Sequence, residues 1–70
     1  MAEILAPMSG NVWKILVKPG DLVAEDDELI VMEAMKMEIP VTAPQDGKVE
    51  KVHVQEGEPV EADALLVTMS

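Results

Sequence analysis

Few side chains in this chain of 70 residues could do chemistry, and composition excludes most candidates. The absence of cysteine excludes thiol nucleophiles, disulfides and thiolate metal sites. The single histidine, His53, has no sequence neighbour suited to a metal site or a nucleophilic triad, so we expect a structural role. Residues 25–28 are acidic but lack the spaced ligands and the glycine of a calcium loop. We therefore predict no catalytic residue and no metal site.

The remaining candidate is a single amine, that of Lys36. The other four lysines fall on predicted strand surfaces or beside predicted turns: Lys14, Lys18, Lys48 and Lys51. Lys36 stands between Met35 and Met37, where the neighbouring strands require a turn, yet no Gly, Asn, Asp or Pro is present. A turn built from Met and Lys has a conformational cost, which suggests that something other than folding selected these residues.

The elements that must position this lysine belong to an internal repeat. Eleven of the 28 residues at positions 6–33 recur 37 positions later in the chain. The identities include Gly10 with Gly47, which we expect to be required by turns. A repeat of this quality predicts one domain made of two like halves, residues 1–33 and 38–70, packed about a pseudo-two-fold axis. We expect each half to cover the apolar face of the other.

Each half is predicted to be all β, because Pro, Gly and β-branched residues are too dense for helices. We expect strands at residues 2–6, 10–17, 28–34, 37–42, 47–54 and 64–69, the longest being 10–17 and 47–54. The apolar spacing slips by one residue after Val12 and again after Val49, which predicts a β-bulge in each half. Residues 18–21 and 55–58 are predicted turns in which glycine can adopt positive φ.

The strands at residues 28–34 and 37–42 are too close in sequence to form anything but a hairpin. In the repeat, this hairpin is equivalent to the strands at residues 64–69 and 2–6, which are the two chain ends. We therefore expect the termini to lie side by side in one sheet. Lys36 should lie at the opposite end of the molecule, exposed on the hairpin tip.

The methionines and the tryptophan are expected to divide between core and surface. We expect Met35 and Met37 to be exposed near the tip, where soft apolar side chains could serve recognition. Packing roles are assigned to three other methionines: Met8, Met32 and Met69. Trp13 aligns with Glu50 in the repeat, so we expect its side chain to face outward.

Charge and composition restrict the partners. The net charge is −9, from five lysines, no arginine and fourteen acidic residues, and aromatic residues make up 1% of the chain. Phosphate backbones need clustered cations and exposed bases need aromatic side chains, so we expect no nucleic-acid partner and no membrane partner. No apolar run is long enough to span a bilayer, and the first residues do not resemble a signal peptide. We therefore expect a cytoplasmic protein. We also expect it to be monomeric on its own, because the negative charge makes copies of the chain repel one another.

Residues 33–38, Glu-Ala-Met-Lys-Met-Glu, resemble the attachment motif of biotin carboxyl carrier domains in the biotinyl/lipoyl family. The resemblance covers essentially the whole chain, residues 1–70, including an Ala-Pro…Gly segment on both sides of the motif. It implies an all-β flattened barrel or sandwich of two four-stranded antiparallel sheets with a pseudo-two-fold internal repeat. It also implies that biotin is attached covalently to Lys36. The stretch at residues 17–23 is as short as its repeat partner, so the chain is more similar to the thumbless carriers. Those carriers usually end a longer polypeptide after an Ala/Pro-rich linker, which is not present here. We expect either a free-standing small carrier, which Met1 favours, or an excised domain.

The resemblance also implies partners and roles for the residues beside the lysine. A biotin protein ligase would recognise the residues that flank it: Glu33, Ala34, Met35, Met37 and Glu38. The swinging arm would then carry carboxyl groups between a biotin carboxylase and a carboxyltransferase or decarboxylase subunit. The carrier itself would be non-catalytic, so we expect it not to be an enzyme.

Two other readings stay open at this point. The nearest alternative is a lipoyl carrier with lipoate on Lys36, although lipoyl domains more often have Asp before and Ala after the lysine, where this chain has Met35 and Met37. The other is an unmodified structural adaptor, which has no need of a projecting lysine between methionines. The motif does not identify the acyl acceptor or the partner subunits, and it leaves dual modification by biotin and lipoate open.

Overall fold

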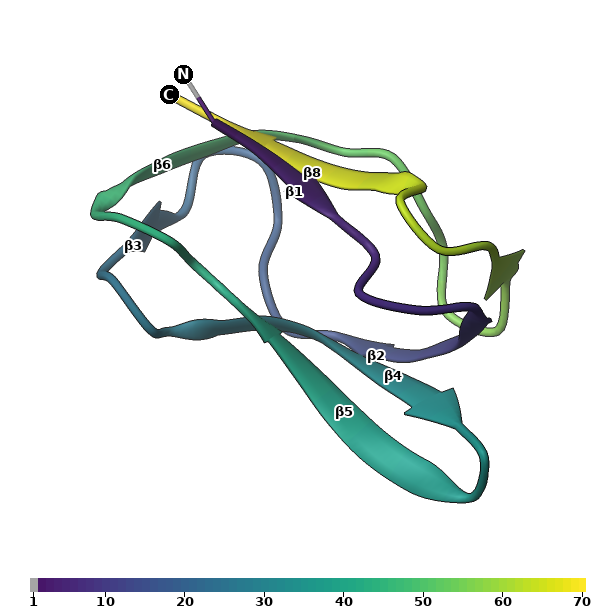
Figure 1. Ribbon diagram of the computed structural model, residues 1–70. Helices are drawn as coiled ribbons and strands as arrows, with labels where there is room; N and C mark the ends of the chain where they lie inside the picture. The colour runs from purple at the N-terminus through teal and green to yellow at the C-terminus, as the bar shows by residue number, and fades with distance from the viewer. Residues whose placement is uncertain (1) are drawn as a thin grey trace.

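The structure is a computed structural model that describes residues 2–70; Met1 lies outside the described residues. It contains eight strands: β1 (Ala2–Leu5), β2 (Gly10–Ile15), β3 (Leu22–Val23), β4 (Glu28–Ala34), β5 (Met37–Thr42), β6 (Gly47–Val52), β7 (Pro59–Val60) and β8 (Leu65–Met69). They form two four-stranded antiparallel sheets, in the orders β1-β8-β6-β3 and β5-β4-β2-β7 (Figure 1). The all-β fold with two such sheets is confirmed. Between residues 2 and 70 there is no helix long and apolar enough to cross a membrane.

The two halves of the repeat exchange strands. Each sheet combines two strands of the first half with two of the second, so that β1 and β3 pair with β8 and β6. Equivalent pairs share one register: Ala2 opposes Met69 in one sheet, as Ile39 opposes Met32 in the other. The halves are therefore interlaced through backbone hydrogen bonds. The pairings of β4 with β5 and of β8 with β1 were expected, and those of β3 with β6 and of β2 with β7 were not anticipated.

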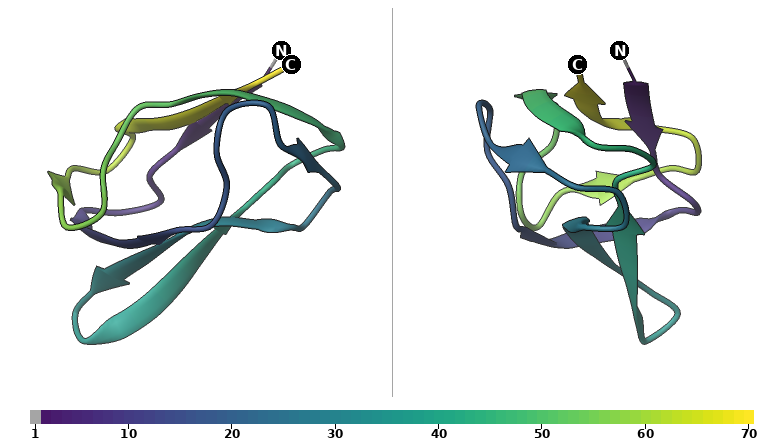
Figure 2. Two further views of the ribbon diagram at one scale, coloured as in Figure 1. Left: turned by 180° about the vertical axis from the view of Figure 1, so that it is seen from behind. Right: turned by 90° about the vertical axis from the view of Figure 1, so that its left-hand side faces the viewer.

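The chain ends and the β4–β5 hairpin lie at opposite ends of the molecule, as expected. Ala2 pairs with Met69, so the two ends of the described chain lie side by side. The hairpin projects from the other end in every view (Figures 1 and 2). The domain measures 30 × 19 × 17 Å, so the hairpin tip and the chain ends are separated by the body of the two sheets.

The predicted bulges are confirmed in both halves. The register shifts between Val12 and Lys14 against β4, and between Val49 and Lys51 against β8. Each shift leaves one residue without a partner, and in β2 this residue is Trp13. Its ring is half-exposed on the outside, as expected, with the Lys14 amine 5.0 Å from the ring centroid, which is within the range of a cation–π interaction.

The predicted strand lengths are wrong in one respect. Residues 10–17 and 47–54 were expected to be the longest strands, but β2 ends at Ile15 and β6 at Val52, and the seven-residue β4 is the longest. The Leu16 amide still donates to the Leu29 carbonyl of β4, and the backbone then crosses to the other sheet, where the Gly20 amide donates to the Val49 carbonyl. Val54 nevertheless stays buried, so its apolar character reflects core packing beyond the strand end.

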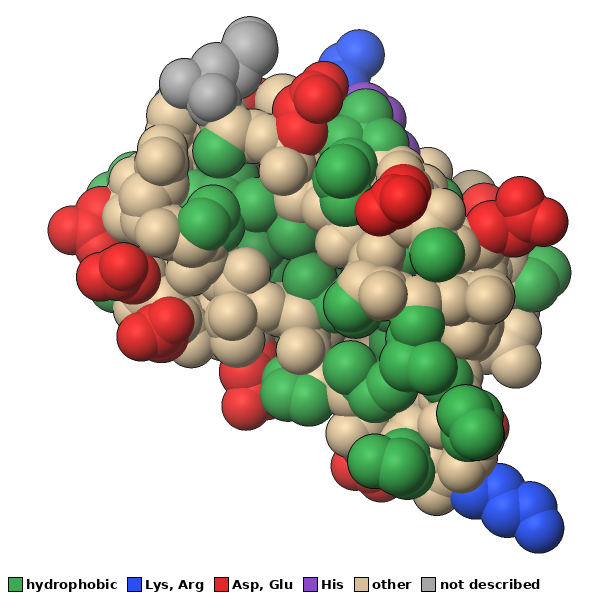
Figure 3. All heavy atoms as spheres, viewed as in Figure 1, with side chains coloured by type: hydrophobic (Ala, Val, Ile, Leu, Met, Phe, Trp, Pro, Cys, Tyr) green, Lys and Arg blue, Asp and Glu red, His purple; other side chains and the backbone are tan. Residues whose placement is uncertain are grey.

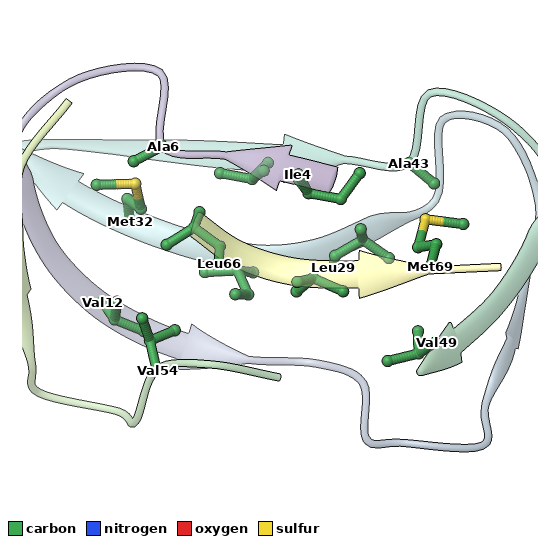
Figure 4. Close-up of a cluster of buried hydrophobic side chains, with 13 residues drawn as sticks. Ile4, Ala6, Val12, Leu29, Met32, Ala43, Val49, Val54, Leu66 and Met69 are labelled. Atoms are coloured by element: carbon green, nitrogen blue, oxygen red, sulfur yellow. The ribbon is translucent and has the colours of Figure 1, made fainter. Parts of the chain in front are cut away.

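The core between the sheets is aliphatic and follows the repeat. The largest fully buried side chains are Leu29, Ile30, Met32, Leu66, Met69, Val12, Val49 and Val67. Leu29 and Leu66 lie together near its centre, with Met32 and Met69 toward opposite ends (Figure 4). Methionine fills the space at both ends because its unbranched side chain adapts to irregular gaps.

The two predicted glycine turns are confirmed. Gly20 and Gly57 have φ values of 96° and 88°, which glycine adopts without steric penalty. A second pair of left-handed residues, Asp26 and Asp63, was not anticipated, with φ values of 72° and 67°. Aspartate is among the residue types that tolerate this conformation, and the two positions are equivalent in the repeat.

Gly10 and Gly47 serve a different purpose from the one expected. Neither has positive φ, so no turn requires them. A Cβ atom on Gly10 would lie 2.6 Å from the Glu33 carbonyl oxygen and 2.9 Å from the Ala34 Cβ, and one on Gly47 would collide with the Ser70 carbonyl oxygen. These glycines allow a neighbouring strand to approach closely, and at Gly10 that strand is β4, just below the hairpin tip.

We predict that Gly10→Ala destabilises the domain by about 1–3 kcal/mol, because backbone atoms of β4 must move to admit the methyl group. The measurement is the guanidinium unfolding midpoint, followed by the fluorescence of Trp13. Asn11→Ala, at the next and exposed position of β2, is the control and should change stability by no more than about 0.5 kcal/mol. Equal midpoints for Gly10→Ala and the control would show that the close approach is unimportant.

Candidate functional site

The β4–β5 hairpin ends in a two-residue loop. The last cross-strand pair is Ala34 with Met37, which leaves Met35 and Lys36 to reverse the chain. Their φ values are 51° and 63°, and positive φ at both central residues is what a type I′ turn requires. Such turns favour Asn-Gly, and a longer side chain held in this conformation costs about 1 kcal/mol or more. The predicted turn and its conformational cost are both present.

The tip is exposed on all sides. Met35 exposes 84% of its surface and Met37 62%, and Lys36 between them is exposed. In Figure 3 a basic side chain extends clear of the surface at this end of the molecule. Among residues 2–70, no side-chain hydrogen bond involves the Lys36 amine. The amine is therefore free to enter the active site of another protein.

The base of the hairpin is packed against β2. Ala34 is only 7% exposed, and its methyl group lies beside the backbone at Gly10. Of the six residues at positions 33–38, Ala34 is the one whose side chain is buried. Its contribution is to hold the base of the hairpin close to β2, and the other five side chains form the exposed part of the tip.

The two faces of the tip differ in character. Glu33 and Glu38 are cross-strand partners and both are exposed, so two carboxylates stand opposite each other on one face. Like charges in this position repel, and neither carboxylate accepts a hydrogen bond from another side chain within the described range. Met37 lies on the other face, which it shares with Ala34. A two-residue loop enforces this pairing, so the opposed carboxylates could have been deduced from the sequence.

His53 and the acidic run at residues 25–28 form hydrogen bonds away from the hairpin tip. The His53 ring forms a hydrogen bond to the Thr68 hydroxyl, with 2.8 Å between Nε2 and Oγ1. In the acidic run, the Asp27 carboxylate accepts a hydrogen bond from the Ala24 amide inside its own turn. Within residues 2–70, no three His, Asp or Glu side chains are grouped so that they could hold a metal ion.

A shallow hollow of about 340 Å³ lies between the edge strands β1 and β5. Its lining is mainly apolar and proline-rich and includes Ile4, Pro40 and Val41. Glu3 is the one ionisable side chain among the lining residues, so the hollow lacks a pair of groups for acid–base chemistry. The candidate site is therefore the hairpin tip, where Lys36 is exposed on a projecting two-residue turn.

Comparison with known proteins places this geometry in a family. The model of the biotin/lipoyl family, described as biotin-requiring enzyme, matches residues 2–69. The chain belongs to this family. The resemblance seen in residues 33–38 is thereby confirmed.

Curated relatives of this biotin/lipoyl domain match about half of it. It is 50% identical over 36 residues to the biotin/lipoyl attachment protein of Bacillus subtilis, covering 51% of this chain and 49% of that protein. It is 50% identical over 38 residues to the biotin carboxyl carrier protein of Streptococcus mutans, covering 54% of this chain and 29% of that protein. A match to the mitochondrial propionyl-CoA carboxylase alpha chain of Caenorhabditis elegans has 57% identity over 35 residues, 50% of this chain and 5% of that one. The domain thus covers about half of the length of the Bacillus subtilis protein and a smaller share of the other two proteins.

Solved structures match the biotin/lipoyl domain over its full length. Urea carboxylase of Kluyveromyces lactis superposes with a TM-score of 0.93 and 35% identity, covering 99% of this chain and 6% of that one. The lipoyl domain of the 2-oxoglutarate dehydrogenase complex from Azotobacter vinelandii superposes with a TM-score of 0.85 and 28% identity, covering 100% and 96%. Both neighbours confirm the two-sheet fold.

We predict that Met35→Asn stabilises the domain by about 0.5–1 kcal/mol, because asparagine adopts the left-handed conformation of a type I′ turn more readily. Guanidinium unfolding measures the change. Met37→Asn replaces the same side chain two residues later, where φ is not positive, and should give no gain. A loss of stability in Met35→Asn would mean that the turn holds no conformational cost.

Proposed function

We propose that this chain is a biotin carboxyl carrier in which biotin forms an amide with the Nζ atom of Lys36. The observation that carries the proposal is an unpaired lysine on a projecting, conformationally costly hairpin tip between two exposed methionines. Membership of the biotin/lipoyl family supports it, as do relatives named biotin carboxyl carrier protein and propionyl-CoA carboxylase.

The geometry of the tip fits a prosthetic group attached by another enzyme. Lysine is protonated at neutral pH and does not react spontaneously with a carboxylate. A ligase must therefore supply an activated biotinyl carboxyl and remove the proton, which requires the whole side chain to enter the ligase active site. Lys36 meets this requirement because it is exposed on a two-residue turn, whereas Lys14 lies against the Trp13 ring on a strand.

The flanking residues are proposed to be what the ligase recognises. Glu33 and Glu38 offer a negatively charged face, and Met35 and Met37 offer apolar contacts on either side of the amine. Ala34 is buried at the base of the hairpin, and its proposed role is indirect: it keeps the base packed on β2.

The domain is proposed to act as a non-catalytic carrier. When bound, biotin supplies a ring nitrogen that accepts and releases a carboxyl group, taken from a biotin carboxylase and delivered to a carboxyltransferase or decarboxylase. The projecting tip lets one long arm reach both active sites, and tethering raises the local concentration without tight binding at either. The net charge of −9 supports a monomeric carrier, because copies repel one another, and we propose a cytoplasmic location.

A lipoyl carrier is the second candidate, and the similarity to the Azotobacter vinelandii lipoyl domain is the observation in its favour. Lys36 would then hold lipoate through the same amide bond. The residues next to the lysine distinguish the two readings. Met35 and Met37 match the biotin motif, and the Asp and Ala more often found in lipoyl domains are absent here.

Lys36→Arg is predicted to abolish biotinylation and leave the fold intact, because guanidinium retains the charge but is not an acyl acceptor for the ligase. The assay incubates the chain with biotin protein ligase, ATP and biotin, and reads intact mass and a streptavidin blot. Lys48→Arg, at an exposed lysine beside a turn, is the matched control and should be modified normally. A biotinylated Lys36→Arg protein would refute the assignment.

Replacing Met35 with Asp and Met37 with Ala is expected to lower the biotinylation rate roughly tenfold, the effect of losing one good apolar contact. The double variant Met35→Leu, Met37→Leu keeps the apolar surface and should lose less. Rates with a lipoate ligase, measured on the same proteins, test the alternative carrier. Unchanged biotin loading in the Asp/Ala variant would show that the flanking residues are not recognised.

A further inference from the structure

Methionine is distributed unevenly over this domain. Met32 and Met69 are fully buried in the core, with no exposed surface. Met35 and Met37 expose 84% and 62% of their surface and flank Lys36 on both sides. The two most accessible sulfur atoms of these four therefore lie next to the proposed attachment point.

Folding does not account for sulfur at these two positions. Met35 has positive φ, where Asn, Asp or Gly would be favoured, and Met37 is largely exposed on an edge strand. Among the described residues, the large aliphatic side chains exposed at other positions are leucines: Leu5, Leu16 and Leu22. A methionine supplies the same apolar surface as leucine and adds an oxidisable thioether.

We propose that Met35 and Met37 form a reversible oxidation site that switches the tip between an apolar and a polar state. A peroxide transfers one oxygen atom to the thioether sulfur: the O–O bond breaks, an S–O bond forms, and hydrogen peroxide leaves as water. The sulfur loses two electrons and the peroxide gains them. Methionine sulfoxide reductases reverse the change by using a thiol reductant, with one enzyme for each sulfoxide epimer.

The fold is built to tolerate oxidation at the tip but not in the core. The Met35 and Met37 side chains face solvent, so a sulfoxide oxygen there stays hydrated, and the strand ladder of the hairpin consists of backbone hydrogen bonds. A sulfoxide on Met32 or Met69 would instead be a polar group in an apolar core without a partner, which destabilises the folded state. Of these four methionines, the accessible pair lies at the tip and the inaccessible pair lies in the core.

The consequence of the switch rests on the function proposed above. A ligase that reads apolar flanks around Lys36 would meet two polar, chiral sulfoxides in their place. Modification of the lysine should therefore slow under oxidising conditions and recover on reduction, with no change in the fold.

Treating the intact folded chain with hydrogen peroxide and mapping sulfoxides by peptide mass spectrometry tests the site itself. Met35 and Met37 should oxidise at least roughly tenfold faster than Met32 and Met69, and the difference should vanish in guanidinium. Equal rates for these four methionines in the folded chain would overturn the site.

The rate of biotinylation by biotin protein ligase tests the switch. Oxidised chain should be modified roughly tenfold more slowly than untreated chain, and reductases of both specificities should restore the rate. For the double variant Met35→Leu, Met37→Leu, the ratio of rates with and without peroxide should be close to unity, whatever its own basal rate. An unchanged rate for oxidised chain would overturn the switch and leave the proposed function standing. Absence of biotinylation in every form would refute the proposed function and the switch together, while peptide mapping decides the oxidation site separately.

Discussion

The pairing of Ala34 with Met37 leaves only two residues to reverse the chain, and the rest of the site depends on this constraint. It forces Met35 and Lys36 into the left-handed region, where both residues are exposed. The pairing is held in place because Gly10 lets β2 approach β4 immediately below the tip. A cluster of aliphatic side chains between interlaced sheets supports this base, so an unfavourable turn is maintained by favourable packing elsewhere.

The duplicated architecture explains why the hairpin is the distinctive part of the molecule. Strand pairs, bulges, glycine turns and buried methionines each have an equivalent in the other half. The equivalent of the β4–β5 hairpin is β8 with β1, and there the chain ends replace the turn. The turn is thus the feature that the repeat does not duplicate, and it lies at the opposite end from the termini (Figure 1).

Much of this arrangement follows from the sequence because the repeat constrains it. The slip after Val12, repeated after Val49, indicated the bulges, and the short spacing between two strands indicated the hairpin and the exposed lysine. The hairpin and its repeat equivalent indicated two of the strand pairings that join the halves. The pairings of β3 with β6 and of β2 with β7 were not predictable, since alternation of apolar residues defines faces but not hydrogen-bonding neighbours. The two-residue strands β3 and β7 are too short to show any periodicity. The purpose of Gly10 depends on the approach of a strand more than twenty residues away, which only the folded structure reveals.

The central claim is that one amine on the hairpin tip holds the prosthetic group. Peptide mapping of the chain purified after expression in cells with a biotin protein ligase tests it most directly. We expect one biotin per modified chain, joined to Lys36, with the other four lysines unmodified. Biotin on any of those four, or lipoate in place of biotin on Lys36, would contradict it.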